Sequence, residues 1–244
     1  MSNLKNKNIV VTGGNGLLGA EFVSKLRSDG ATVFNLEKNI DSDDFNINCD
    51  ITNENSVKKA IKNITKKYQK IDGWVNNAYP RTKDWGNKFE DVSYESWKKN
   101  IDLQLGSVFL CSKLVVDHMK KNRSGSLLNI ASIYGVVAPE FSIYKGTSMT
   151  TPAAYSAIKG GVINFSRYLA SYYGKYGIRI NCVSPGGIFN NQSKTFIKNY
   201  ISNVPLMRMA NPDDISPIVS FLMSNDSKYI TGQNIVVDGG WTCK

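Results

Sequence analysis

Thr12-Gly13-Gly14-Asn15-Gly16-Leu17-Leu18-Gly19 (TGGNGLLG) lies between a β-branched run and an amphipathic segment. The run before it, Lys7–Thr12 (KNIVVT), predicts a buried strand, and Leu17–Leu26 has the apolar spacing of a helix. Glycines allow a tight turn and a close approach of the backbone to a pyrophosphate, whose charge the helix N-terminus then stabilises. Strand, glycine turn and helix in this order predict a dinucleotide-binding unit.

Strands and helices alternate along the rest of the chain. Further strands are predicted at Thr32–Leu36, Phe45–Cys49, Gly73–Asn76, Ser126–Ile130, Arg179–Ser184 and Asn234–Val237. Further helices are predicted at Asn53–Tyr68, Tyr94–Met119, Ala153–Tyr173 and Asp213–Met223. Lys38–Asp44 is shorter than the roughly 10–12 residues of a crossover helix, so we expect a loop there. The pattern predicts an α/β fold, a single Rossmann-type domain over residues 1–244 whose doubly wound parallel sheet carries helices on both faces.

Composition excludes several classes of protein. The 244 residues are 41% hydrophobic, too apolar for a disordered chain, and no apolar run approaches the roughly 18 residues that span a bilayer. The N-terminal residues enter a strand directly, so no secretion signal is visible. The four cysteines are scattered without a C-x-x-C pair, so we expect neither a metal site nor disulfides. A cytoplasmic location follows as the default.

The formal net charge of +10 has one local feature, because Phe141–Pro212 contains no acidic residue. The lysines are dispersed and match no nucleic-acid motif, which argues against a nucleic-acid partner. Two interpretations stay open, an ordinary solvated surface and a pocket for an anionic molecule. The second predicts an electropositive mouth formed by Lys145, Lys194, Lys198 and Arg208.

Tyr155-Ser156-Ala157-Ile158-Lys159 places a tyrosine and a lysine at positions i and i+4, on one face of a helix. An unperturbed tyrosine has a pKa near ~10, too high for efficient acid–base catalysis at neutral pH. A nearby ammonium group stabilises the phenolate and lowers that pKa. Alone, this spacing also occurs by chance in ordinary amphipathic helices.

These motifs occur with others in a fixed order. The set comprises Thr12–Gly19, Asn76-Asn77-Ala78, Ser132, Tyr155 with Lys159, Asn181, Pro185-Gly186, Thr231–Gln233 and Val237–Gly240. Together they resemble the short-chain dehydrogenase/reductase family along nearly the whole chain. More narrowly, VNNAYPR (Val75–Arg81), FEDVSY (Phe89–Tyr94), IASIYGVVAP (Ile130–Pro139) and SPGGIFNNQ (Ser184–Gln192) resemble oxidoreductases of flagellin modification and nonulosonic-acid synthesis.

The resemblance implies roles for individual residues. Tyr155 would be the general acid/base, Lys159 would lower its pKa and bind the nicotinamide ribose, and Ser132 would bind the reacting oxygen. The helix residue of the proton relay aligns with Gln104, and Asn100, one turn earlier, is the alternative. The residues expected to contact an NAD cofactor are Gly13, Asn15, Gly16, Leu17, Leu18, Glu37, Asp50, Ile51, Asn77, Ala78, Tyr155, Lys159, Pro185, Gly186 and Ile188.

Glu37 ends the second strand and bears on the choice of cofactor. A carboxylate there can accept hydrogen bonds from both adenine-ribose hydroxyls and repels the additional phosphate of NADP. Lys38 beside it weakens the argument, so NAD is preferred and NADP remains the alternative.

Three features depart from the family pattern. The T-G-x-x-G-x-x-G spacing is similar to the extended branch, which includes nucleotide-sugar epimerases and dehydratases. Tyr79-Pro80-Arg81 stands where a glycine usually follows Asn-Asn-Ala, and either holds a sugar and an anion or forms a stiff surface loop. The spacing between Ser132 and Tyr155 is longer than usual. The hydroxyl-rich 140–152 segment and a lid at 190–210 are therefore predicted to contact the substrate, with a subunit contact as the alternative for the first.

We therefore expect an NAD(P)-dependent oxidoreductase that transfers a hydride to or from a carbinol or carbonyl carbon of a sugar derivative, as in the synthesis of surface glycans. The alternatives are a nucleotide-sugar epimerase or dehydratase that recycles bound NAD, and a non-catalytic cofactor-binding module. The expected substrate is an anionic or polyhydroxylated small molecule, without nucleic-acid or membrane partners. We expect a homo-oligomer, a tetramer or dimer, with Trp241 and Thr242 packing into a neighbour.

Overall fold

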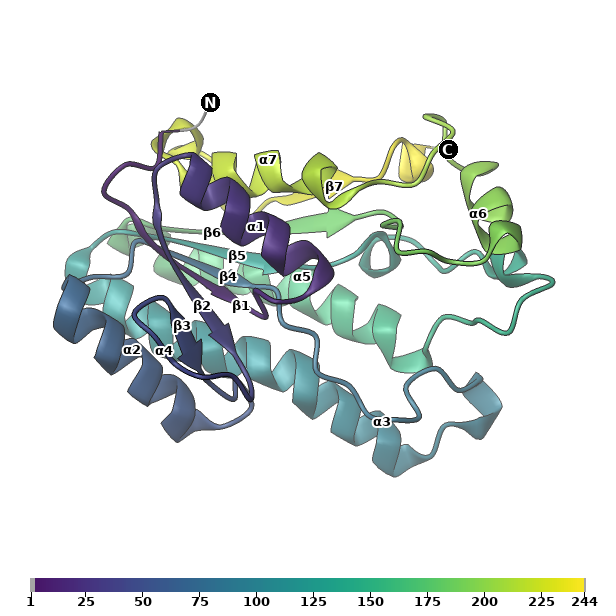
Figure 1. Ribbon diagram of the computed structural model, residues 1–244, viewed down its shortest axis with the longest axis horizontal. Coiled ribbons are helices and arrows are strands. Elements are labelled where there is room, and N and C mark those ends of the chain that lie inside the picture. The colour runs from purple at the N-terminus through teal and green to yellow at the C-terminus, as the bar shows by residue number, and fades with distance from the viewer. Residues whose placement is uncertain (1–2, 244) are drawn as a thin grey trace.

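A seven-stranded parallel sheet forms the centre of the molecule. The computed structural model describes residues 3–243, and the strands lie in the order β3-β2-β1-β4-β5-β6-β7 (Figure 1). Their bounds are β1 Asn8–Thr12, β2 Thr32–Glu37, β3 Asn46–Asn48, β4 Gly73–Asn76, β5 Gly125–Ile130, β6 Ile178–Pro185 and β7 Asn234–Val237. The order reverses between β1 and β4, and parallel α/β sheets bind ligands at the carboxyl ends of the strands at such a point.

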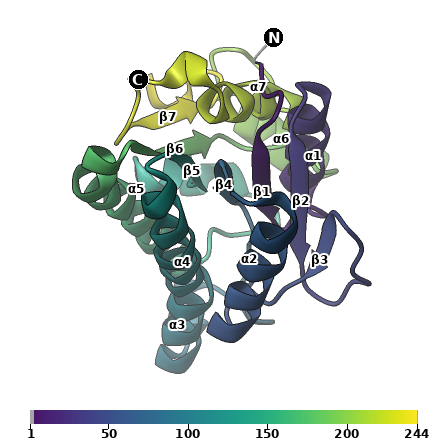
Figure 2. The same cartoon turned by 90° about the vertical axis from the view of Figure 1, so that its left-hand side faces the viewer.

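Helices cover both faces of this sheet. α1 (Leu17–Ser28) and α7 (Pro212–Met223) pack together on one face, while α2 (Glu54–Tyr68), α4 (Ser107–Asn122) and α5 (Ala153–Tyr173) cover the other (Figure 2). α3 (Tyr94–Ile101) leads into α4, and α6 (Lys194–Ile201) lies beyond the carboxyl ends of the strands (Figure 1). Within residues 3–243, no helix combines the length and apolar character needed to span a bilayer.

The apolar run of β1 is continuous because both of its faces are buried. Ile9 and Val11 pack with Phe22 of α1 and Val219 of α7. Val10, between them, points to the opposite face and joins the cluster under α2, α4 and α5. Burial on both sides therefore explains why β1 is apolar at successive positions instead of alternating.

The predicted strands agree with the observed ones to within one residue at each end, and Lys38–Asp44 is a loop as expected. The long helix predicted over Tyr94–Met119 is helical along its whole length, but it is not a regular α-helix. A π-helical turn at Asp102–Gly106 separates α3 from α4, which continues to Asn122. A π turn inserts one residue into a helix without ending its hydrogen-bonded ladder, so apolar periodicity does not reveal it.

Candidate active site

A cavity of about 830 Å³ opens at the carboxyl ends of the strands, around the reversal between β1 and β4. The glycine end of this cavity is formed by the glycine turn, Glu37–Lys38, Asp50–Thr52 and Asn77–Ala78. The tyrosine end is formed by Tyr79–Arg81, Ser132–Tyr134, Ile143–Tyr144, Tyr155, Lys159, Asn190, Phe196 and Tyr200. Pro185, Gly186 and Ile188, which were expected at the nicotinamide, also line the cavity.

The glycine turn needs its glycines for steric reasons. Gly13 has φ +68°, in the left-handed region that other residues rarely adopt. A Cβ on Gly19 would lie 2.0 Å from the carbonyl oxygen of Gly13 and 2.8 Å from the Cα of Gly14. The first turn of α1 therefore packs directly on the backbone that precedes it, and the turn has no room for side chains.

The N-terminus of α1 has the features of an anion cradle. Gly16 is its N-cap and has no side chain to cap the first amides, and Gly16, Leu17 and Leu18 line the cavity. Uncapped N–H groups together with the helix dipole favour a negatively charged group at this position. The residues present therefore fit the pyrophosphate of a dinucleotide.

Two asparagines hold the turn in place. Asn77 donates from Nδ2 to the carbonyl oxygens of Thr12 and Gly13, both at 3.0 Å. Asn35, buried in the middle of β2, accepts a 2.9 Å hydrogen bond from the backbone N–H of Gly14 and donates to the side chain of Asn15. Sequence reasoning missed Asn35, although a polar residue inside an apolar strand could have signalled it. The side chain of Asn15 is directed toward Asn35, and Asn15 does not line the cavity.

Charged groups at the end of β2 distinguish between ligands. The Glu37 carboxylate accepts hydrogen bonds from the backbone N–H groups of Asn15 and Lys38. The Lys38 ammonium lies 2.7 Å from the Asp50 carboxylate. Burial acts to raise the pKa of Asp50, but hydrogen bonds from Lys38 and Thr52 outweigh it and hold that pKa below its usual range. Because Lys38 is paired, the part of the cavity beside the end of β2 suits the hydroxyl groups of a ribose better than an additional phosphate on it.

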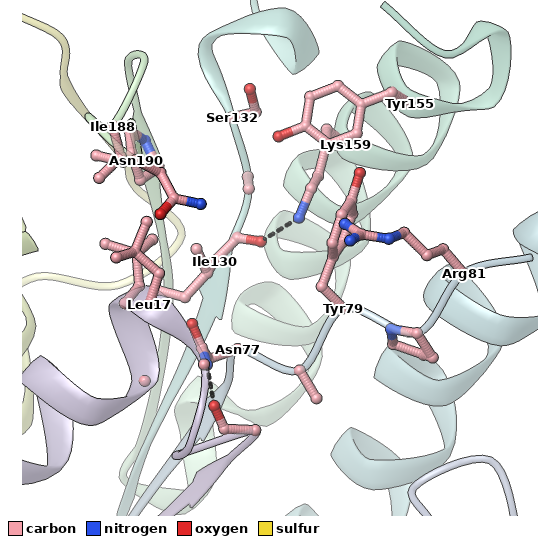
Figure 3. Close-up of a pocket in the computed structure, with 18 of the residues that line it drawn as sticks. Leu17, Asn77, Tyr79, Arg81, Ile130, Ser132, Tyr155, Lys159, Ile188 and Asn190 are labelled. Atoms are coloured by element: carbon pink, nitrogen blue, oxygen red, sulfur yellow. Dashed lines mark hydrogen bonds between the residues drawn. The ribbon is translucent and has the colours of Figure 1, made fainter. Parts of the chain in front are cut away.

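The predicted Ser132, Tyr155 and Lys159 come together at the tyrosine end (Figure 3). Ser132 follows β5, while Tyr155 and Lys159 lie on successive turns of α5. Lys159 Nζ donates a 2.8 Å hydrogen bond to the carbonyl oxygen of Ile130 and lies 5.7 Å from the centroid of the Tyr155 ring. The arrangement places a hydroxyl donor, a phenol and an ammonium group around one point in the cavity.

The pKa of Tyr155 does not follow the expected direction. Burial raises it, and the hydrogen bond with Ser132 only partly opposes that effect. Burial also lowers the pKa of Lys159 to about 8. The cost of burying a phenolate therefore dominates the pKa of Tyr155, and the Lys159 ammonium beside it donates its hydrogen bond to Ile130.

Neither of the two candidates for the proton-relay residue, Gln104 and Asn100, lines the cavity. Gln104 is buried in the π turn and does not line the cavity, and its side-chain amide has no hydrogen-bond partner among residues 3–243. Asn100 accepts from the backbone N–H of Thr82 and donates to Thr82 Oγ1 and to the Ser96 carbonyl oxygen. Asn100 is therefore occupied in holding the loop after β4, and Gln104 remains a prediction.

The predicted electropositive mouth is wrong, because none of Lys145, Lys194, Lys198 and Arg208 lines the cavity. α6 directs Phe196 and Tyr200 inward, and its lysines consequently lie on the exposed face. Arg208 forms two hydrogen bonds, of 2.6 and 2.7 Å, with the carboxylate of Asp214.

The hydroxyl-rich segment 140–152 also contributes less than expected, since only Ile143 and Tyr144 of it line the cavity. Sequence reasoning missed Tyr134, Phe196 and Tyr200, which make this end aromatic. Trp241, expected to contact a neighbouring subunit, stacks on Tyr200 of its own chain at 4.6 Å between ring centroids. Tyr200 and Trp241 thus belong to one apolar cluster within a single chain.

Comparison with known proteins agrees with this geometry. A family model described as enoyl-(acyl carrier protein) reductase matches residues 18–242. The post-translational flagellin modification protein A of Campylobacter coli is 35% identical, over 98% of this chain and 99% of that protein. The 7alpha-hydroxysteroid dehydrogenase of Bacteroides fragilis is 32% identical, over 99% and 96%.

A solved structure has the same fold. The short chain dehydrogenase from Leptospira borgpetersenii serovar Hardjo-bovis, crystallised with bound NAD+, is 37% identical, with a TM-score of 0.89 over 98% of this chain and 94% of that chain. With the glycine cradle and the Ser132, Tyr155 and Lys159 group at the two ends of one cavity, this chain belongs to the short-chain dehydrogenase/reductase family of NAD(P)-dependent oxidoreductases.

Proposed function

We propose that this enzyme uses NAD to interconvert a carbinol and a carbonyl group on a sugar derivative of the kind built into surface glycans. The observation that carries the proposal is the position of Ser132, Tyr155 and Lys159 in one cavity with Glu37. The flagellin modification relative, at 35% identity over nearly the full length, supports the substrate class.

The proton chemistry follows from the side chains. Burial raises the pKa of Tyr155, so its hydroxyl is protonated at neutral pH and can donate a proton to the oxygen of a carbonyl undergoing reduction. Ser132 donates a hydrogen bond to the same oxygen and so orients it. Lys159, protonated below a pKa of about 8, stabilises the tyrosinate that remains. A bound nicotinamide dinucleotide supplies or accepts the hydride.

The glycine end supports NAD in preference to NADP. Glu37 places a carboxylate where a 2′-phosphate would otherwise lie, and Lys38 is neutralised by Asp50. A phosphate here would meet the Glu37 carboxylate, and the nearby Lys38 ammonium is already paired with Asp50.

Two substrate classes fit different features of the tyrosine end. Tyr134, Tyr144 and Tyr200 combine aromatic faces with hydroxyl groups, which suits a polyhydroxylated ring. The apolar Ile143 and Phe196 also line it, and the hydroxysteroid dehydrogenase relative makes a steroid the second candidate. We favour the sugar because that relative is less similar to this chain than the flagellin modification protein.

The test is turnover of NAD(H) and NADP(H) with neutral sugars, sugar acids, sugar phosphates, nucleotide sugars and hydroxysteroids. We expect a sugar derivative to be turned over with NAD(H), and Tyr155→Phe to lower kcat roughly 10²- to 10⁴-fold while NADH binding is retained. Full activity of Tyr155→Phe contradicts the acid/base assignment. Turnover of steroids alone supports a steroid as the substrate. Isomerisation of a sugar without net redox change supports an epimerase. Cofactor binding without turnover of any compound supports a non-catalytic module.

We also propose that the chain forms a homo-oligomer through α4 and α5. Phe109, Tyr168 and Tyr172 are all more than half exposed along these helices, and Phe165 packs between Phe109 and Tyr168. Large exposed aromatic groups in a row are typical of a surface that associates. Sedimentation of the wild type and of Tyr168→Glu tests this, and identical monomeric profiles contradict it.

A further inference from the structure

The loop that follows β4 brings an unusual pair of side chains into the tyrosine end, Tyr79 and Arg81. The ring of Tyr79 meets the ring of Tyr155 edge to face, with centroids 6.0 Å apart and planes at 84°. It contacts Trp85 in the same way, with centroids 5.8 Å apart. Aromatic contacts on two sides therefore hold Tyr79 in one position beside Tyr155.

The other end of the loop is held by hydrogen bonds. Asn100 is buried and accepts a 3.1 Å hydrogen bond from the backbone N–H of Thr82. Its Nδ2 donates to Thr82 Oγ1 at 2.8 Å. Arg81 thus lies between two anchored residues, Tyr79 and Thr82, and its backbone has a defined place at the rim of the cavity.

The guanidinium group of Arg81 lies 5.4 Å from the centroid of the Tyr79 ring. Figure 3 shows it directed toward Tyr79. Stacking on an aromatic face orients the planar group and leaves its N–H donors free along the edge. The side chain is therefore presented to the cavity with its hydrogen-bonding edge available.

Arg81 also differs from the other cations that line the cavity. Lys38 is paired with Asp50, and Lys159 donates to the Ile130 carbonyl oxygen. Among residues 3–243, no carboxylate lies within 4.0 Å of Arg81, and no side-chain hydrogen bond engages it. The tyrosine end thus has a positive group without a counterion, one aromatic ring away from Tyr155.

We propose that Arg81 is a specificity-determining residue that binds an oxyanion, a carboxylate or a phosphate, carried by the substrate close to its reacting carbon. This deepens the proposed function and rests on it. The fork of N–H donors in a guanidinium group binds either oxyanion through two parallel hydrogen bonds. Because the ring of Tyr79 contacts Tyr155 on one side and Arg81 on another, the anion is bound on the same side of the cavity as the reacting carbon. The substrate class is an acidic sugar or a sugar phosphate, and a steroid without an acidic group does not use this contact.

The test compares three variants on matched compounds. Arg81→Met removes the charge and Arg81→Lys keeps it without the fork, while Lys83→Met removes an exposed charge of the same loop that does not line the cavity. Each is assayed with NAD(H) on the best substrate and on neutral, carboxylate and phosphate forms of the same sugar. Titration calorimetry of D-glucose, D-glucuronate and D-glucose 6-phosphate into the NADH-loaded enzyme provides a second measurement that needs no turnover.

We expect the best substrate to be anionic and Arg81→Met to raise its KM roughly 10- to 100-fold, with kcat changed by less than about 3-fold. The KM of Arg81→Lys should fall between those of the wild type and Arg81→Met, and the KM of Lys83→Met should match that of the wild type. Preference for the carboxylate or for the phosphate form identifies which oxyanion is bound.

Equal KM values for Arg81→Met and wild type on the best substrate overturn the proposal for Arg81. The proposal for Arg81 is also overturned if Arg81→Met binds the anionic and the neutral sugars with the same affinities as the wild type. This outcome counts even if no substrate is turned over. Loss of activity in Tyr155→Phe alongside either result leaves the proposed function standing. If no carbinol or carbonyl compound is turned over, the proposed function is contradicted. If anion binding nevertheless depends on Arg81, the anion site is supported.

Discussion

The two ends of the cavity differ in what forms their walls. At the glycine end the decisive groups belong to the backbone, with Gly13 at φ +68°, the uncapped amides of α1 and the packing of Gly19 on the preceding turn. At the tyrosine end they are side chains from loops and short helices, such as Tyr79, Arg81 and Tyr200. A backbone cradle suits a ligand part shared by many enzymes, whereas loop side chains can change with the substrate. Variants at each end should therefore fail in different ways.

Gly19→Ala should have the largest effect on the stability of the fold and on cofactor binding. The added Cβ would lie 2.0 Å from the Gly13 carbonyl oxygen, so the turn must shift. We expect a loss of about 1–3 kcal/mol in the free energy of unfolding and an increase of roughly 100-fold or more in the Kd for NADH. Denaturant titration and NADH fluorescence measure the two quantities.

The matched control is Gly86→Ala, because a Cβ on Gly86 meets no atom within 4 Å. It should leave both quantities unchanged. Normal NADH binding by Gly19→Ala would mean that the glycine end is less constrained than its backbone geometry indicates.

Lys159→Met should stabilise the cofactor-free protein while it abolishes activity. Burial lowers the pKa of Lys159 from 10.5 to about 8, so at neutral pH the folded state holds a partly buried charge at a cost. After allowance for the lost hydrogen bond to Ile130, we expect a gain of about 1–2 kcal/mol, or an increase of about 2–6 °C in Tm at pH 7.

The sign of this effect depends on pH. The unfolded chain binds more protons than the folded one between about pH 8 and 10.5, so wild-type stability rises relative to the variant across that range. The advantage of Lys159→Met should therefore shrink from pH 8 to pH 10.5. A constant difference in Tm across this range, or a lower Tm for Lys159→Met at pH 7, would show that Lys159 is not strained by burial.

Glu37→Gln should change the choice of cofactor. The substitution keeps an acceptor for the Asn15 N–H but removes the negative charge at the end of β2. We expect the ratio of kcat/KM for NADH over NADPH to fall roughly 10-fold. Asp41→Asn, at an exposed position that does not line the cavity, should leave the ratio unchanged. A preference for NADPH in the wild type contradicts the assignment of Glu37.

Arg208→Met should have the smallest effect on catalysis. Arg208 is paired with Asp214 outside the cavity, so its removal should leave the preference between anionic and neutral substrates unchanged. The same pair lowers the pKa of Asp214 to about 2. Any stability that it contributes is present above pH 3.8 and is lost as the pH falls toward 2, so the difference in Tm between wild type and variant should disappear in that range. A change in substrate preference would show that Arg208 does contribute to substrate binding.

The fold was largely predictable because its signals are local. Thr12–Gly19 combines a strand end, glycine positions and a helix start within a few residues, and each obeys a short-range steric rule. The resemblance to the short-chain dehydrogenase/reductase family, which rests on many motifs in a fixed order, predicted the group of Ser132, Tyr155 and Lys159 that the cavity brings together. The π turn at Asp102–Gly106 was not predictable from apolar spacing, because it shifts the helix by one residue without changing its composition.

The lysines of the 141–212 stretch illustrate what a sequence leaves undecided. The absence of acidic residues suggested a basic mouth, yet the amphipathic α6 places Lys194 and Lys198 on its exposed face because Phe196 and Tyr200 are buried. Among residues 3–243, the cation that lines the tyrosine end without an ion pair is instead Arg81, from a loop far away in the chain. Net charge is a sum over residues, whereas the potential in a cavity depends on which charges face it and which are paired.

The sequence by itself determined the parallel α/β architecture, the glycine cradle and the identity of the tyrosine and lysine pair, since these depend on backbone sterics and on spacing along one helix. Only the tertiary structure decided that Lys38 is neutralised by Asp50, that burial raises the pKa of Tyr155, and that Arg81 enters the cavity with no counterion from the described part of the chain. Each of these depends on groups distant in the chain that share a small volume. Desolvation and charge pairing are properties of that volume, and they arise only when the chain has folded.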